Sequence, residues 1–192
     1  MLSCLLVCPP VTADVLGSGP PLTHRSYSVD AALLSDCVST AAIERDADFV
    51  MEAESACVGQ GFTQCSEMRN DRVTMITCLS LERQYWEWRL DRMVEGLSGA
   101  YSPPEFVQGV QMTAPELQAT VIVWRAYAET KCSYLTSQYG VGRSRGREGD
   151  IVEYACLNGE TARFSLEIEN RLKEHCRSGR RPVYGEICED LS

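Results

Sequence analysis

The chain has 192 residues, a length that suits one domain, and its 44% hydrophobic and 23% charged residues are ordinary globular usage. With 27 Asp and Glu against 18 Lys and Arg, the formal net charge is −9. This acidic balance argues against a general nucleic-acid binder, because such proteins need cations that displace phosphate counterions.

The N-terminal segment Met1–Ala13 is uncharged and apolar, and Val11-Thr12-Ala13 is typical of a signal-peptidase site before Asp14. It is too short to span a membrane. We therefore expect an exported protein, periplasmic or secreted, with residues 1–13 as a signal peptide and residues 14–28 as a linker.

The first half of the remaining chain is predicted to be helical. Val29–Cys37 and Ala41–Cys57 contain no internal helix breaker and are rich in helix-forming residues. In Thr74–Leu97, apolar residues recur at spacings of three and four, which predicts one long helix with one buried stripe that carries Trp86. The glycines and prolines from Gly96 onward are expected to end it.

The second half is predicted to form two more helices. Thr113-Ala114-Pro115-Glu116 is a capping signal, and the helix that follows carries Trp124 on its apolar stripe. After the loop Tyr139–Gly149, Asp150 and Glu153 repeat the capping pattern, and Asn158-Gly159 is expected to break the last helix. No strand-like alternation of useful length appears. The predicted fold is all-α, a helical bundle over residues 29–176 with a short irregular tail over residues 177–192.

The ten cysteines indicate a disulfide framework and an oxidising compartment. A zinc site would need close Cys or Cys/His pairs, whereas Cys-x-x-Cys is absent and His24 and His175 lie far apart, so we expect no metal and no cofactor. Signal cleavage leaves eight cysteines. The flexible loop between two helices favours pairing of Cys132 with Cys156, and the tail favours Cys176 with Cys188. For the other four, Cys37–Cys57 with Cys65–Cys78 is favoured and other pairings stay open.

The order of residues resembles the LprI-type, lysozyme-inhibitor-like family of exported bacterial proteins. The resemblance covers roughly residues 37–172. It rests on Cys57-Val58-Gly59, Cys65, Met75-x-x-Cys78, Glu82, Tyr85-Trp86-Glu87-x-Arg89-Leu90-Asp91, then Trp124-x-x-Tyr127, Cys132 and Cys156 followed by Thr161-Ala162. It implies an exported binding protein that inhibits a lysozyme-type hydrolase.

Several positions depart from the family pattern. Val121 stands where the family usually has Gln, and Ala128 where it usually has Arg. Glu87 replaces Asp, and Asp91 replaces Asn. We therefore expect the polar network that those family residues make to be altered in this chain.

Candidate catalytic groups are few. Glu82, Glu87 and Asp91 share one helix with several arginines and are interpreted as solvated ion pairs, because a glycosidase needs carboxylates that face each other across a cleft. Trp86 and Trp124 are interpreted as core residues. No nucleophile, base and orienting group assemble in the sequence, so we expect no enzyme activity.

The candidate binding residues lie in the loop after residue 138, which carries Tyr139, Arg143, Arg145 and Arg147. Long glycine-bearing loops between rigid elements are common binding sites. Two functions remain open. The first is inhibition of a lysozyme-type hydrolase, whose basic surface would attract an acidic protein. The second is a structural or adaptor protein that contacts an anionic envelope component through the three arginines.

Overall fold

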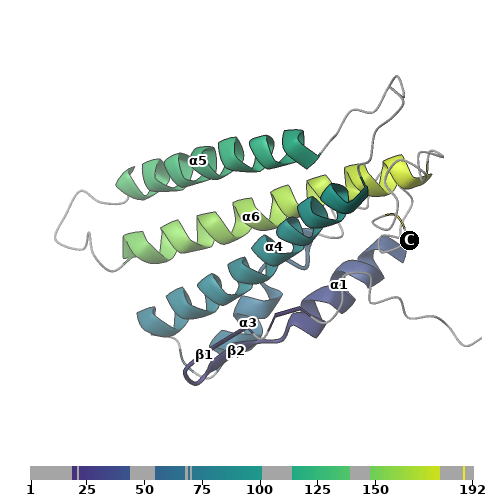
Figure 1. Cartoon of the computed structure of the whole chain (residues 1–192). Coiled ribbons are helices and arrows are strands. Elements are labelled where there is room, and N and C mark those ends of the chain that lie inside the picture. Colours follow the sequence, from purple (N-terminus) through teal and green to yellow (C-terminus); the bar gives the residue numbers. More distant parts are fainter. Residues whose placement is uncertain are drawn as a thin grey trace, which may run out of the picture.

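The computed structural model describes residues 19–20, 22–43, 55–67, 69, 71–100, 114–138, 148–177 and 188. Over these residues the predicted all-α, disulfide-stapled bundle is confirmed (Figure 1). The elements are β1 (Leu22–His24), β2 (Tyr27–Val29), α1 (Ala31–Ile43), α3 (Gln60–Ser66), α4 (Arg72–Ala100), α5 (Ala114–Gln138) and α6 (Glu148–His175).

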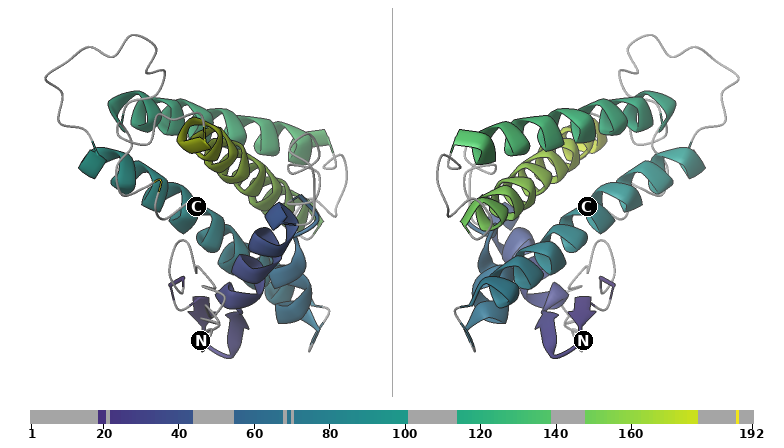
Figure 2. Two further views of the ribbon diagram at one scale, coloured as in Figure 1. Left: turned by 90° about the vertical axis from the view of Figure 1, so that its right-hand side faces the viewer. Right: turned by 90° about the vertical axis from the view of Figure 1, so that its left-hand side faces the viewer.

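Three long helices form the body of the bundle, and α6 lies between α4 and α5 (Figures 1 and 2). The short elements β1, β2, α1 and α3 gather around the N-terminal half of α4. Helix α5 therefore packs mainly on α6, and none of the other described elements covers the side that faces away from the bundle. None of the helices described is long and apolar enough to cross a membrane.

Two hydrophobic clusters form the core. The first joins the hairpin, α1, α3 and the N-terminal half of α4 to α6, and its largest fully buried side chains are Tyr85 and Trp86. The second joins the C-terminal half of α4 to α5 and α6, with Leu90, Met93 and Leu172 fully buried. The interpretation of Trp86 as a core residue is confirmed. A 29-residue helix such as α4 can serve both clusters because it spans the whole length of the bundle.

Aspartates cap the two helices that follow the turns. The Asp30 carboxylate accepts hydrogen bonds from the first backbone amides of α1. Asp71 Oδ1 accepts a bond of 3.0 Å from the amide of Thr74 at the start of α4, and its Oδ2 accepts the Thr74 hydroxyl at 2.9 Å. Such caps satisfy amides that have no partner inside the helix.

Four disulfides join the eight cysteines in the pairs that the sequence favours: Cys37–Cys57, Cys65–Cys78, Cys132–Cys156 and Cys176–Cys188. The first holds α1 to the turn before α3, and the second joins α3 to α4. The third joins α5 to α6. The fourth ties Cys188, which is buried in the second core cluster, to the end of α6.

The N-terminal part differs from the sequence prediction. Residues 22–29, expected to be mostly linker, form an antiparallel hairpin in which Thr23 pairs with Ser28 and His24 with Tyr27. Strands of three residues are too short to show an alternating pattern. One helix, α1, replaces the first expected helix and runs through the expected gap, while Cys57 lies in a turn. Residues 44–54, in the second expected helix, lie outside the described residues.

Helix α4 ends at Ala100, inside the stretch from Gly96 onward that the sequence predicts as its end. Two expectations for α6 are wrong. It begins at Glu148, so Asp150 lies inside its first turn. Helix α6 runs without a break through Asn158-Gly159, because the Asn158 side chain is buried and bonded to Glu82. Packing of this kind outweighs the weak helix propensity of the pair.

Candidate functional site

A fully buried carboxylate, Glu82, lies where α3, α4 and α6 meet, and 0% of its surface is exposed. Its Oε1 accepts hydrogen bonds from the Gly59 amide at 2.7 Å, Trp86 Nε1 at 3.1 Å and Asn158 Nδ2 at 3.2 Å. Its Oε2 accepts the Phe62 amide at 2.6 Å. Four donors offset the cost of removing the charge from water. The prediction that Glu82 forms a solvated ion pair is therefore wrong.

Two glycines make room for this carboxylate. Gly59 has φ +93°, in the left-handed region that favours glycine, and this conformation presents its amide to Glu82. A Cβ atom on Gly61 would lie 2.7 Å from Val29 Cγ1 and 3.3 Å from Glu82 Oε2, which is too close. The turn before α3 and the start of α3 are thus shaped around Glu82.

A second buried network joins α4 to α6. Arg89 Nη2 donates to Glu169 Oε2 at 2.6 Å, and Lys173 Nζ lies 2.8 Å from Glu169 Oε1. Burial alone would raise the pKa of Glu169, but the charges of Arg89 and Lys173 outweigh burial and lower this pKa to about 2. Arg89 also donates to the Tyr85 hydroxyl at 2.9 Å, and burial raises the pKa of Tyr85.

These two networks stabilise the fold, and their carboxylates are poorly placed for acid–base chemistry. The oxygens of Glu82 and Glu169 are shielded from solvent and already accept bonds. Glu87 and Asp91 pair with Arg83 and Arg125 at the surface, as the sequence predicts. Within the described ranges, no group of three His, Cys, Asp or Glu residues could hold a metal ion.

The most exposed apolar surface of the described residues lies on α5. Ile122 is 68% exposed, Val123 69%, Tyr127 57% and Tyr134 63%. We call Val123, Tyr127 and Tyr134 the outer face of α5, and Ile122 lies on a neighbouring side of the helix. Val123, Tyr127 and Tyr134 are four and seven residues apart, so they share one side of the helix. Exposed tyrosines grouped with aliphatic side chains are typical of surfaces that bind other proteins.

The opposite side of α5 holds the helix firmly on α6. Val121 and Ala128, where the family usually has Gln and Arg, are buried, so apolar packing occupies these positions. Trp124 is half-buried and stacks on Phe164 of α6, with ring centroids 4.4 Å apart. This rigid support limits the entropy that the outer face would lose on binding.

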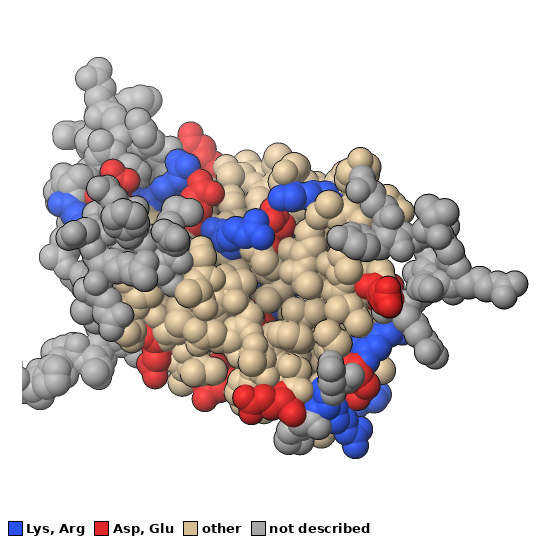
Figure 3. Space-filling view, turned by 180° about the vertical axis from the view of Figure 1, so that it is seen from behind, with Lys and Arg blue, Asp and Glu red and all other residues tan. Residues whose placement is uncertain are grey.

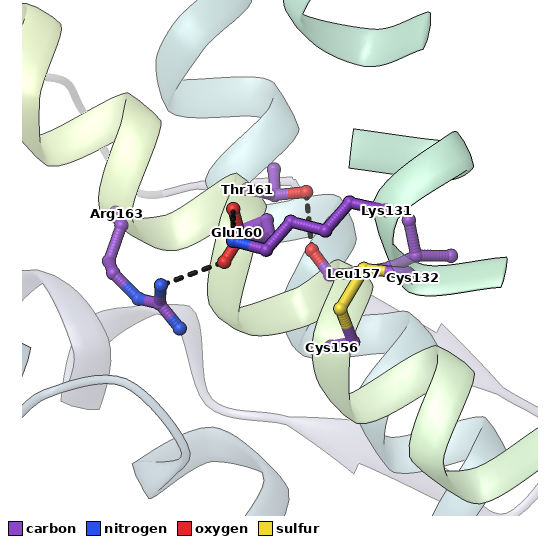
Figure 4. A network of polar contacts seen from close by, with 7 residues as sticks. All are labelled: Lys131, Cys132, Cys156, Leu157, Glu160, Thr161 and Arg163. Carbon is purple, nitrogen blue, oxygen red and sulfur yellow. Dashed lines mark hydrogen bonds and ion pairs between the residues drawn. A yellow bond between two sulfur atoms is a disulfide. The ribbon is translucent and has the colours of Figure 1, made fainter. Parts of the chain in front are cut away.

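A polar cluster and a disulfide reinforce the same contact (Figure 4). Lys131 Nζ of α5 lies 3.0 Å from Glu160 Oε2, and Arg163 Nη1 lies 2.7 Å from Glu160 Oε1, so the two cations reach one carboxylate of α6. The Cys132–Cys156 disulfide links the two helices beside this cluster. The cluster positions α5, and Lys131 Nζ also lies 5.8 Å from the centroid of the Tyr127 ring at the edge of the outer face.

Charges of both signs lie close together on one face of the molecule. On the face in Figure 3, Lys and Arg side chains stand next to Asp and Glu side chains in a row, with uncharged areas on both sides. Ion pairs within α6, Arg163–Glu160 and Arg171–Glu167, have the same mixed character. The formal net charge of the whole chain is −9, and a charge of this size acts at long range.

The binding residues predicted from the sequence, Tyr139, Arg143, Arg145 and Arg147, lie outside the described residues. Sequence reasoning missed the outer face of α5. The signal was present, because Ile122 and Val123 follow the buried Val121 directly and cannot all point to one core. A search for a single apolar face of a helix does not detect apolar residues on its other sides.

Comparison with known proteins gives one match. The family model described as "Lysozyme inhibitor LprI" matches residues 64–164, which is more than half of the chain and includes all of α4 and α5. Neither the curated proteins nor the solved structures contain a match.

Proposed function

Because the chain belongs to the lysozyme inhibitor LprI family, we propose that it is an exported envelope protein that binds and inhibits a lysozyme-type hydrolase. Family membership is the observation that carries this proposal. The four disulfides support it, since such frameworks persist in oxidising compartments such as the periplasm or the exterior. The exposed apolar side chains of the outer face of α5 support a role in binding.

We place the contact with the hydrolase on the outer face of α5. This face lies inside the family match and holds three of the most exposed large hydrophobic side chains described. Its tyrosines supply large contact area with few rotatable bonds. Lysozyme-type enzymes generally present a basic surface, and the net charge of −9 would attract them over a distance before the outer face makes contact.

The test is an inhibition assay with the wild type and two variants. Replacing Tyr127 and Tyr134 together with alanine should weaken inhibition about tenfold or more, because interface tyrosines commonly contribute more than about 1 kcal/mol each. A matched pair of valine substitutions separates the effect of the position from the effect of the chemical change. Val123→Ser changes the outer face, whereas Val73→Ser makes the same change at a similarly exposed valine (61%) on α4 and should leave inhibition unchanged.

The results divide clearly. No inhibition by the wild type at micromolar concentration would refute the inhibitor function. Inhibition that survives the double tyrosine variant would refute the outer face of α5 as the contact and leave the function standing. The alternative function, contact of an anionic envelope component through Arg143, Arg145 and Arg147, stays a prediction, because those residues lie outside the described part of the chain.

A further inference from the structure

We propose that this protein has a second binding site, a polar groove that takes a neutral sugar unit. The groove lies between the hairpin, α4 and the start of α6, and its volume is about 280 Å³. We call it the hairpin groove. It is lined by Thr23, His24, Ile76, Thr77, Ser80, Leu81, Gln84 and Tyr154.

The hydroxyl groups of the α4 wall are free to contact a ligand. In α5 and α6, the threonine hydroxyls commonly bond back to the carbonyl four residues earlier, as in Thr120, Thr130, Thr136 and Thr161. Thr77 and Ser80 of α4 make no such bond within the described structure, although both lie inside a helix and are half-buried. Their hydrogen-bonding capacity is therefore available to the groove.

The other lining groups have matching chemistry. Gln84 contributes an amide, Tyr154 a phenol and His24 an imidazole, and each can both donate and accept hydrogen bonds. Ile76 and Leu81 add aliphatic surface. A sugar ring combines hydroxyls with an apolar face of C–H groups, so it matches both parts of this lining.

A charged ligand matches the groove poorly. The lining contains no Asp, Glu, Lys or Arg, so an ion that entered would lose hydration without gaining a counter-charge. The volume of about 280 Å³ lies just below the range of roughly 300–1,000 Å³ usual for small-molecule sites. One ring of a longer saccharide therefore suits the groove better than a large ligand.

The groove is built on fixed elements. Tyr27 of the hairpin shares a hydrogen bond of 3.1 Å with the Thr74 hydroxyl of α4, and Leu22 and Val29 anchor the two strands in the core. The Cys65–Cys78 disulfide holds α4 directly beside Thr77. A preformed site loses little entropy on binding. No residue of the outer face of α5 lines the groove, so this inference is independent of the inhibitor function.

The experiment is a titration of the full chain with a neutral trisaccharide of N-acetylglucosamine, followed by amide chemical shifts, with inorganic phosphate as the charged comparison. The test variant carries Thr77→Val and Ser80→Ala, which remove the two hydroxyls and keep nearly the same shape. The control variant carries the same two changes on α5, Thr120→Val and Ser133→Ala. Thermal unfolding checks that each variant is folded, and Gln84→Leu provides a second groove variant at an exposed position.

We expect the trisaccharide to shift amides around the hairpin groove. The test variant should bind it roughly tenfold or more weakly, since two hydrogen bonds are lost, and the control variant should bind as the wild type does. Gln84→Leu should also weaken binding. The proposal would be overturned by the absence of shifts at millimolar trisaccharide, by shifts confined to other surfaces, by equal binding in folded groove variants, or by phosphate binding in the groove.

Discussion

At the scale of single residues, Glu82 is the group whose loss should matter most to the fold. Glu82→Gln keeps the shape but replaces one acceptor oxygen with a donor that faces the amide or side-chain donors now bound there. We expect a loss of about 3 kcal/mol or more in the free energy of unfolding, because buried donors are left without an acceptor. Urea unfolding followed by circular dichroism measures it.

Glu87→Gln is the matched control on the same helix. Glu87 is partly exposed and pairs with Arg83 at 3.2 Å, so its substitution should change the free energy of unfolding by less than about 1 kcal/mol. Equal effects of the two substitutions would show that the Glu82 network does not hold the turn before α3 in place.

Glu169 should make stability depend on pH in the acid range. Its pKa is about 2 in the folded protein, below the ordinary glutamate value near 4.5, so the ionised form stabilises the fold. This contribution is complete above about pH 5 and is lost as the pH falls from 4.5 toward 2. Arg89 stays protonated throughout and adds no pH dependence.

The check is unfolding of the wild type and Glu169→Gln at several pH values. At neutral pH the variant should be less stable by about 3–5 kcal/mol, because Arg89 would keep a buried charge without its carboxylate partner. Between pH 5 and 2 the variant should lose less stability than the wild type. Parallel curves over this interval would contradict the assignment.

Residues also show where sequence reasoning reaches its limit. Periodicity identifies Trp86 as a core residue correctly, because its position on the apolar stripe decides its environment. The same reasoning misplaces Glu82, because three of its four donors, Gly59, Phe62 and Asn158, come from outside α4. Those three donors are 20 or more residues away in sequence, and a local pattern contains no information about them.

At the scale of elements, the contact between α5 and α6 depends on a disulfide as well as on packing. Replacing Cys132 and Cys156 with serine opens a loop of 24 residues. By the chain-entropy estimate, this should lower the free energy of unfolding by roughly 3 kcal/mol. Chemical unfolding of the oxidised variant measures the effect.

The same variant tests how α5 is positioned. The Trp124–Phe164 stack and the Lys131–Glu160 pair remain, so far-ultraviolet circular dichroism at low temperature should be unchanged. A loss of helix under these conditions would mean that the disulfide, rather than the packed face, holds α5 on the bundle.

The elements divide into those that the sequence specifies locally and those that it does not. The long helices α4 and α5 follow from apolar spacing and, for α5, from a capping signal. The hairpin does not, because it is stabilised by contact with α4 through Leu22 and Tyr27 rather than by its own pattern. The hairpin groove cannot be predicted from apolar spacing or from capping signals, since its walls come together only in the folded protein.

At the scale of the whole molecule, charge connects the acidic composition to the proposed partner. The net charge of −9 should speed association with a basic hydrolase at low salt, and inhibition should weaken as salt rises toward the range where the Debye length is about 8 Å or less. Inhibition that does not depend on salt would show that electrostatic attraction contributes nothing to recognition.

Arg143, Arg145 and Arg147, between α5 and α6, allow a direct test of this attraction. Replacing Arg143, Arg145 and Arg147 with serine removes three positive charges and takes the formal net charge from −9 to −12. If the protein binds a basic hydrolase through α5, association at low salt should become faster by about twofold or more. Stability should be unchanged, because the sequence predicts a loop at these positions and loop substitutions rarely destabilise. Stopped-flow association with the hydrolase and retention on isolated envelope are measured on this one variant. If the arginines instead bind an anionic envelope component, retention of the variant on isolated envelope should fall sharply. Slower association of the variant with the hydrolase would mean that the three arginines take part in the inhibitory contact.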